Sequence, residues 1–255
     1  MRLRQICLVA EELAPAVDEL CGVLGIEVCY RDPEVAHFGL ENAVMPVRGN
    51  FLEIVAPVEP DTSAGRYLKR RGGNGGYMVI LQCPDALAER ERIAGLGVRH
   101  VYTIDKPAYT ATHFHPRDVG GILLSIDSVE PGADYTDPMC SWAPASRNWQ
   151  IFIRTGRVGE LAGVELQSDD PAAFAQLWSR ILDLPVTQDE SANPVIELIN
   201  GPVRFVPATD GRGAGVGGID LQVADREAVL DAVRERNLLA DGDQIIACGL
   251  RINLV

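Results

Sequence analysis

The sequence is poor in the residues that most often mark a chemical site. Only four histidines and six cysteines occur in 255 residues, and no two cysteines form a C-x-x-C pair. Several cysteines lie inside apolar patterns, where a reduced thiol behaves as a small hydrophobic side chain. No stretch approaches the roughly 18 consecutive apolar residues that span a bilayer, and the opening MRLRQICLVAEELAPAV has too short an apolar run for a signal peptide. We therefore expect a soluble, cytoplasmic protein with no membrane partner.

Basic residues are also too few for a nucleic-acid partner. Asp and Glu number 36 against 23 Lys and Arg, which gives a formal net charge of −13 and a pI near 4.7. A surface that binds nucleic acid is normally basic, so this class of function is excluded. The composition, 47% hydrophobic and 23% charged, is that of a globular protein. The length is sufficient for one large domain or two of ordinary size.

The chain repeats one order of elements four times: an apolar strand, a short turn, an amphipathic helix and several short strands. The four opening strands are contained in LRQICLVA (3–10), GGYMVILQCPD (75–85), LAGVELQSDDP (161–171) and GGIDLQVAD (217–225). Two echoes support the repeat, ILQCPD with DLQVAD and GILLSI with GLRINL. The pattern predicts an α+β fold of four βαβββ-type units paired into two domains. Four unrelated α+β segments remain the alternative.

A segment rich in Pro, Ser, Asp and Gly separates the two halves. It includes SVEPGADYTDPMCSWAPASRNWQ (128–150), a composition typical of a linker. It also contains Trp142 and Trp149, and a free linker seldom exposes two indoles, so we expect both to dock on a domain surface. We predict domains at 1–128 and 158–255 joined by the linker 129–157. RRGGNGG (70–76) lacks the setting of a phosphate loop and is interpreted as a connection between units.

The strands FLEIVAP (51–57) and HPRDVGGILLSID (115–127), at the ends of the first two units, resemble those of the vicinal oxygen chelate superfamily. This superfamily includes glyoxalase I, methylmalonyl-CoA epimerase, extradiol dioxygenases and the bleomycin-resistance proteins. The resemblance covers nearly the whole chain. It implies two glyoxalase-like domains, each a cup-shaped sheet, with a small molecule bound in the cup of the first.

The resemblance also implies a metal held by four side chains on the concave face. The matching positions are Gln5, Glu53, Met78 and Ser125 in the first half, and Gly163, Arg204, Gly218 and Asn253 in the second. A methionine thioether is a poor ligand for a hard divalent ion, and a serine supplies no charge. Glycine has no ligand atom, and arginine repels a cation. We therefore expect no metal site of the family type in the second half and no tightly bound metal in the first.

A divalent metal (Fe, Mn or Zn) bound by His113 and His115 remains an alternative. Residues two apart in an extended strand project from the same face, and an H-x-H pair with a carboxylate is a workable Zn or Fe site. The alternative is that the histidine of the HP turn lies at the end of the strand, where it bonds the backbone or lines the pocket without metal. We expect the alternative.

Glu53 is the strongest candidate for a catalytic residue. A carboxylate inside an apolar strand is costly unless it has a partner or a task, and burial raises its pKa toward the range of a general base. Gln5 and His115 are predicted to orient or polarise a substrate oxygen beside it. The predicted substrate contacts are His113, Met78, Ser125, His37 and Arg117. For His37 a structural role remains open, and Arg117 is either a clamp for a carboxylate or phosphate or a surface residue.

Two functions follow from these residues. The first is an enzyme of the lyase, isomerase or dioxygenase type that acts on a small organic molecule, with Glu53 as base. The second is a protein that binds a small molecule or antibiotic without chemistry, as the bleomycin-resistance proteins do. Retention of Glu53 favours the first, and loss of the metal ligands favours the second. Fold alone does not decide between them, and a homodimer is possible in either case.

Overall fold

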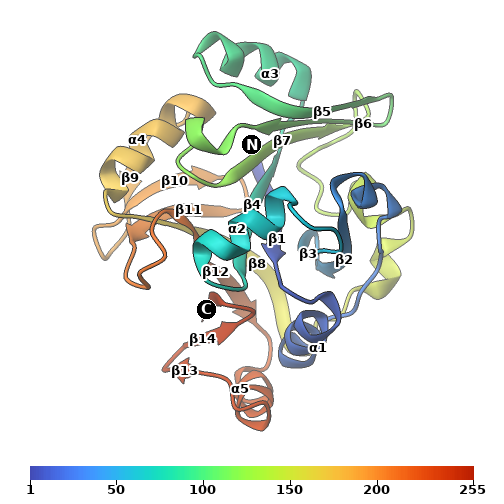
Figure 1. Cartoon of the computed structure of the whole chain (residues 1–255), viewed down its shortest axis with the longest axis vertical. Helices are drawn as coiled ribbons and strands as arrows, with labels where there is room; N and C mark the ends of the chain where they lie inside the picture. The colour runs from blue at the N-terminus through green and yellow to red at the C-terminus, as the bar shows by residue number, and fades with distance from the viewer. The chain divides into compact units, whose positions relative to one another are not determined.

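The computed structural model describes residues 1–255 and has a mixed α+β architecture with two β-sheets (Figure 1). The first repeat contains β1 (Arg2–Val9), α1 (Leu13–Leu24), η1 (Pro33–Phe38), β2 (Leu40–Val47) and β3 (Asn50–Pro57). A further helix, α2 (Ser63–Arg71), leads to the second repeat. The second repeat contains β4 (Gly75–Gln82), α3 (Ala86–Gly95), β5 (His100–Lys106), β6 (Tyr109–Phe114), η2 (Pro116–Asp118) and β7 (Leu123–Val129).

The second half of the chain follows the same order. Two short helices, η3 (Ala143–Ala145) and η4 (Trp149–Phe152), interrupt the segment between the halves. The third repeat contains β8 (Val158–Ser168), α4 (Pro171–Leu182), β9 (Thr187–Gln188), β10 (Pro194–Leu198) and β11 (Gly201–Pro207). The fourth contains β12 (Gly215–Val223), α5 (Arg226–Glu235), β13 (Ala240–Asp241), β14 (Gln244–Ala247) and β15 (Leu250–Leu254).

All four repeats share one strand topology. The first and last strands of each repeat are parallel neighbours, β1 with β3, β4 with β7, β8 with β11 and β12 with β15. The remaining strands add antiparallel beyond the last strand. The strand order is β2-β3-β1-β4-β7-β6-β5 in one sheet and β13-β14-β15-β12-β8-β11-β10-β9 in the other. The predicted fold of four βαβββ-type units is confirmed.

The helices begin where the turn chemistry predicts. Asp85, Asp170 and Asp225 are the N-caps of α3, α4 and α5, and each carboxylate accepts a hydrogen bond from a backbone amide of the first turn. These bonds satisfy amides that have no partner within the helix. In α1, Glu12 holds the N-cap position and makes no such bond. The same cap therefore opens three of the four repeats.

The chain divides into two compact units that do not follow its order. Unit 1 contains 1–4, 78–143 and 163–217, and unit 2 contains 5–77, 144–162 and 218–255. Unit 1 thus combines the second and third repeats, and unit 2 combines most of the first with the fourth. The predicted domain limits of 1–128 and 158–255 stay a prediction.

Aromatic packing forms the core of unit 1 between α4 and β11. Phe174, Trp178 and Phe205 contact one another edge to face, with ring centroids 5.5–6.2 Å apart. The Trp178 indole N–H donates a 3.0 Å hydrogen bond to the Val119 carbonyl of the second repeat. Next to it Gly120 has φ +90°, and a Cβ there would lie 2.1 Å from the Phe174 ring. Only glycine fits this turn against the helix.

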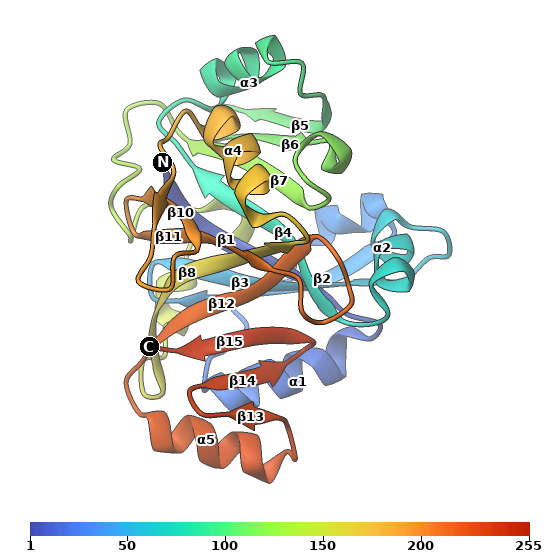
Figure 2. The ribbon, with the colours of Figure 1, turned by 90° about the vertical axis from the view of Figure 1, so that its left-hand side faces the viewer.

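In unit 2, α1 packs on β2 and β3 and against α5, which lies beside β13 (Figure 2). The Arg157 guanidinium donates to the carbonyls of Gly22 and Val23, at 2.5 and 3.2 Å, near the end of α1. The Cys248 amide donates to the Glu19 carboxylate on the same helix. The packing of α1 on α5 and the bond between Cys248 and Glu19 therefore join the first and fourth repeats in one core.

Both tryptophans between the halves are buried. Trp142, 1% exposed, contacts Tyr109 edge to face in unit 1, and the Arg4 guanidinium lies 5.2 Å from its ring centroid. Trp149 contacts Phe51 in unit 2, with centroids 4.9 Å apart. The buried indoles and the cation–π geometry show a segment held by specific contacts. No helix in the structure has the length and apolar character required to cross a membrane.

Candidate functional site

Glu53 lies in the middle of β3, on the side of the sheet that also carries Gln5 and Cys7. In the parallel register, Cys7 is the neighbour of Glu53 and Gln5 the neighbour of Phe51. Gln5 and Glu53 are 1% and 9% exposed. Two residues that the sequence predicts as catalytic partners are therefore adjacent in the fold.

The Glu53 carboxylate is held by neutral donors. Gln5 Nε2 donates to Oε2 at 2.8 Å, and Asn42 Nδ2 donates to Oε1 at 2.6 Å. The Asn42 Oδ1 accepts from the Asp32 amide at 2.7 Å, which fixes the orientation of its amide group. Asn42 reaches Glu53 from β2, where it faces Val55 in the antiparallel register.

Burial raises the pKa of Glu53, while hydrogen bonds from Asn42, Cys7 and Gln5 oppose this shift and Asp32 adds to it. The groups that determine this pKa include no cation, so no ion pair stabilises the carboxylate form. A buried carboxyl group with amide partners and a raised pKa is suited to accept and return a proton.

A second buried carboxyl group is that of Asp127 on β7, which lies in unit 1, whereas Glu53 lies in unit 2. Tyr109 Oη donates to its Oδ2 at 2.5 Å, and Ser125 Oγ is hydrogen-bonded to its Oδ1. Both Ser125 and Asp127 are 0% exposed. Burial raises the pKa of Asp127 to about 7, against the opposing effects of Ser125, Tyr109 and the Thr112 amide.

The two histidines of the H-x-H pair lie in different local structures. Strand β6 ends at Phe114, so His113 lies on the strand and His115 does not. His115 is the N-cap of η2, and its Nδ1 accepts from the Arg117 amide at 3.2 Å. His115 therefore lies past the end of the strand and bonds the backbone, in line with the alternative that we expect, because Pro116 starts a helical turn directly after it.

The other predicted substrate contacts are dispersed. Met78 on β4 is buried at 6% exposure, and the Ser125 hydroxyl also lies 3.3 Å from the Thr112 carbonyl. Arg117 is exposed. His37 is exposed on η1, where its ring contacts Phe38. Their roles as substrate contacts stay predictions.

The residues at the family's metal positions do not fit a divalent ion. Both Glu53 oxygens already accept amide hydrogen bonds. The Ser125 hydroxyl is engaged by Asp127 and Thr112, and Met78 offers only a thioether. No group of three or more His, Cys, Asp or Glu side chains is arranged to hold a metal ion.

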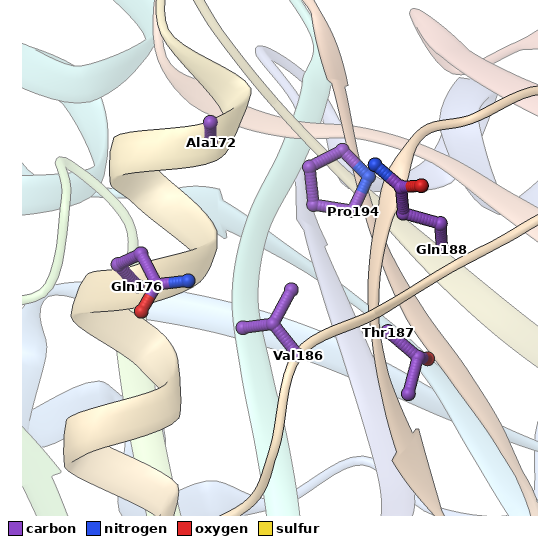
Figure 3. A pocket seen from close by; sticks show the side chains of 6 residues that line it. All are labelled: Ala172, Gln176, Val186, Thr187, Gln188 and Pro194. Atoms are coloured by element: carbon purple, nitrogen blue, oxygen red, sulfur yellow. The ribbon is translucent and has the colours of Figure 1, made fainter.

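In the second half, the two side chains present at the corresponding positions are hydrogen-bonded to carboxylates of the protein. Arg204 Nη2 donates to Glu165 Oε1 at 3.1 Å in unit 1. In unit 2, Asn253 Nδ2 donates to Asp220 Oδ1 at 2.8 Å. Gly163 and Gly218 offer no side chain. A surface hollow of about 470 Å³ lies beside α4 and contains none of the predicted site residues (Figure 3). It is lined by Ala172, Gln176, Val186, Thr187, Gln188 and Pro194.

Sequence reasoning missed Asn42, Cys7, Asp127 and Tyr109. Two of them carry a recognisable signal. Asn42 follows Glu41 at the start of a strand whose other residues are apolar. Asp127 is two residues from Ser125, which places both on one face of an extended strand. Tyr109 and Cys7 carry no such signal, because their partners depend on the register between strands.

Four repeats with parallel first and last strands, arranged in two curled sheets, define the architecture as a paired βαβββ fold. A family described as glyoxalase-like domain matches residues 6–182, and the chain belongs to this family. The resemblance to the vicinal oxygen chelate superfamily is confirmed. No curated protein matches the sequence.

A solved structure shares the fold of this chain. A triple mutant of 4-hydroxymandelate synthase from Streptomyces coelicolor is 15% identical, with a TM-score of 0.66 over 92% of this chain and 75% of that chain. This likeness establishes the fold of nearly the whole chain. Methylmalonyl-CoA epimerase from Mycobacterium tuberculosis is 23% identical over 51% of this chain and 88% of that chain, with a TM-score of 0.45.

Proposed function

We propose that the chain is an enzyme of the isomerase or lyase type that transfers a proton on a small organic molecule, with Glu53 as general base. The observation that carries this proposal is the buried Glu53 carboxylate, bonded by two neutral amides and by no cation. A carboxylate with a structural role is normally paired with a cation or exposed. One that is buried among amides retains the ability to change protonation state.

The amides of Gln5 and Asn42 fix the orientation of the Glu53 carboxylate. Gln5 and Asn42 each hold one oxygen, and Asn42 is itself anchored by the Asp32 amide. In the ionised state, Glu53 accepts a proton from a carbon next to a carbonyl, and in the neutral state it returns that proton to the same or a neighbouring atom. Gln5 and Asn42 act as positioning residues in this scheme. His115, the other predicted catalytic partner, caps η2 and has no assigned step.

The residues favour proton transfer over the dioxygenase type. Non-haem iron oxygenases hold their metal with two histidines and a carboxylate, and neither Met78 nor Ser125 belongs to such a set. The same two positions support the second candidate, a small-molecule binder of the bleomycin-resistance type. The two candidates differ in whether Glu53 changes protonation state during the reaction.

Deuterium exchange tests the proposal directly. The full chain is incubated in D₂O with a panel of small oxo-acids, thioesters and catechols, and loss of carbon-bound proton signals is followed by NMR. For a compound that exchanges, Glu53→Gln is expected to lower the rate by roughly 100-fold to 10,000-fold, the usual contribution of general acid–base catalysis. The affinity of the Glu53→Gln variant for that compound should change little, because the amide keeps the shape of the carboxylate.

Glu41→Gln is the matched control, since Glu41 is an exposed glutamate on β2 of the same unit. It should leave the rate unchanged. Equal exchange by wild type and Glu53→Gln rules out Glu53 as the base. A compound that binds tightly without any exchange supports the binder instead.

A further inference from the structure

Helix α2 concentrates positive charge in an otherwise acidic chain. The stretch 62–84 contains Arg66, Lys69, Arg70 and Arg71 and neither Asp nor Glu, whereas the whole chain has a formal net charge of −13. The helix lies between the first and second repeats, so the repeat pattern does not account for these side chains. A local group of cations on an acidic protein is a candidate site for an anion.

The cations of α2 are divided between a buried and an exposed face. The helix packs on β3, and its buried residues have the i, i+3, i+4, i+7 spacing of one stripe: Ala64, Tyr67, Leu68 and Arg71. Arg66, Lys69 and Arg70 are exposed, and their spacing of i, i+3 and i+4 places them on one side of the helix. None of the three forms an ion pair, not even with Glu59 or Asp61, the nearest acids in the sequence. The exposed face of α2 therefore carries three positive charges without a carboxylate partner.

Uncharged groups hold the Arg66 guanidinium in place. Its Nη1 donates to the Asp61 carbonyl oxygen, and its Nη2 donates to the Ser63 hydroxyl at 3.0 Å. A guanidinium has five N–H groups. Arg66 therefore keeps donors for a ligand as well as a positive charge that no acid neutralises.

An aromatic ring supports the Arg70 guanidinium. Arg70 Cζ lies 5.0 Å from the centroid of the Tyr67 ring, a cation–π contact. Tyr67 is 5% exposed, its Oη donates to the Gly76 carbonyl at 2.8 Å, and its ring contacts Tyr77 edge to face with centroids 5.0 Å apart. These contacts fix the ring, so Arg66 and Arg70 are both oriented in the free protein. Such preorganisation lowers the entropy cost of binding a ligand.

We propose that Arg66, Lys69 and Arg70 form a binding site for the phosphate group of a small phosphate monoester. Near neutral pH such a group carries about −1.5 to −2 charges and three strong acceptor oxygens. The planar fork of a guanidinium donates two parallel hydrogen bonds to it, and the lysine ammonium adds a point charge. A phosphate diester has a single negative charge and binds more weakly to the same three cations. The site lies on the exposed face of α2 and makes no use of Glu53.

Phosphorus NMR tests the site with two matched probes. Methyl phosphate is titrated with the full-length chain, and dimethyl phosphate serves as the singly charged comparison. At pH 8 and physiological ionic strength, we expect saturable binding of methyl phosphate and at least fivefold weaker binding of the diester. Arg66→Gln and Arg70→Gln should each weaken methyl phosphate binding at least fivefold. Absence of saturation, equal binding of the two probes, or wild-type affinity in both variants overturns the proposal.

Two further variants distinguish a specific site from general attraction by positive charge. Arg180→Gln is the matched control, because Arg180 is also an exposed arginine in the last turn of a helix, α4, and its affinity should stay within 1.5-fold of wild type. Arg70→Lys keeps the charge but loses the planar fork, so it should weaken binding at least threefold. An equal loss in Arg180→Gln, or wild-type affinity in Arg70→Lys, means attraction by charge alone and contradicts the site. All the altered side chains are exposed, and an unchanged melting temperature verifies that each variant is folded. The measurement reports binding and not exchange, so its result does not depend on Glu53.

Discussion

Asp127 is a residue whose protonation state depends on folding. In the unfolded chain its pKa has the ordinary value of 3.8, and in the fold burial raises it to about 7. Well below pH 3.8 the carboxyl group is neutral in both states. Between pH 4 and 7 the unfolded chain releases a proton that the folded chain retains, so the free energy of unfolding falls as the pH rises through this window.

Asp127→Asn is expected to remove this loss. An asparagine amide donates to Ser125 and accepts from Tyr109, which is the pattern of the neutral acid. Its stability should match the wild type near pH 4 and exceed it at pH 8 by an amount on the order of 4 kcal/mol at most, since one pKa unit corresponds to about 1.4 kcal/mol. Urea unfolding of both proteins at several pH values measures the difference.

Asp105 provides a control of opposite sign. It is ion-paired with Arg90 at 2.7 Å, and this contact lowers the pKa of Asp105. The pair therefore stabilises the fold above the ordinary pKa of 3.8 and loses this effect in acid, so Asp105→Asn should be less stable than wild type at pH values above 3.8 and should approach it in stronger acid. If the free energies of unfolding of Asp127→Asn and wild type differ by the same amount at every pH, the fold does not raise the pKa of Asp127.

Single residues also mark the limit of sequence reasoning about the site. Glu53 was predictable, because a carboxylate in FLEIVAP has no other explanation than a partner or a task. The amide partner Gln5 was predictable from the family position. Asn42 was not, because its reach to Glu53 depends on β2 and β3 pairing with Asn42 opposite Val55. A one-residue change of register moves every side chain to the other face.

Secondary-structure elements were predictable where caps and periodicity agree. The helix of the third repeat follows an Asp-Pro start and a single apolar stripe, and α4 spans Pro171–Leu182. The repeat order places a strand after the first helix, at IEVCYRD (26–32), but only Tyr30 forms a β-bridge there, with Val44. The chain turns away there, because the Asp32 amide bonds the Asn42 side chain and Pro33 starts η1. Helix α2 was missed, because it lies outside the repeat.

The turn before β7 shows how one element constrains another. Gly120 has φ +90° and lies against Phe174 of α4, whereas Gly97 has φ +82° with nothing within 4 Å of an added Cβ. Gly97→Ala should cost about 1–2 kcal/mol, the strain of the left-handed conformation alone. Gly120→Ala adds a clash with the aromatic core and should cost at least about 1–3 kcal/mol more.

Thermal unfolding of the two variants measures this difference. Gly97 is the matched control, because both glycines have positive φ and belong to the second repeat in unit 1. Equal destabilisation of the two variants would mean that α4 does not press on this turn. A larger loss in Gly120→Ala supports the packing of the second repeat against the third.

Each compact unit of the chain combines repeats from both halves of the sequence. In unit 1, α4 and β11 of the third repeat share a core with the turn before β7, and the Arg92 guanidinium of α3 donates to the Ile181 carbonyl of α4. Sequence reasoning identified the repeats, because each carries its own strand and helix pattern. It did not predict which repeats share a core, because all four have similar apolar faces.

Separated fragments should therefore fold poorly. A fragment of residues 158–255 contains Trp178 as its only tryptophan, which in the full chain is 0% exposed and bonded to Val119. Without the second repeat, the indole loses this partner and Phe174 loses the contact with the Gly120 turn. We expect red-shifted Trp178 emission, quenching by acrylamide and a broad unfolding transition. Adding a fragment of residues 1–157 should restore shielding. Shielded Trp178 emission and a sharp transition in the isolated fragment would instead show that the second half has a core of its own.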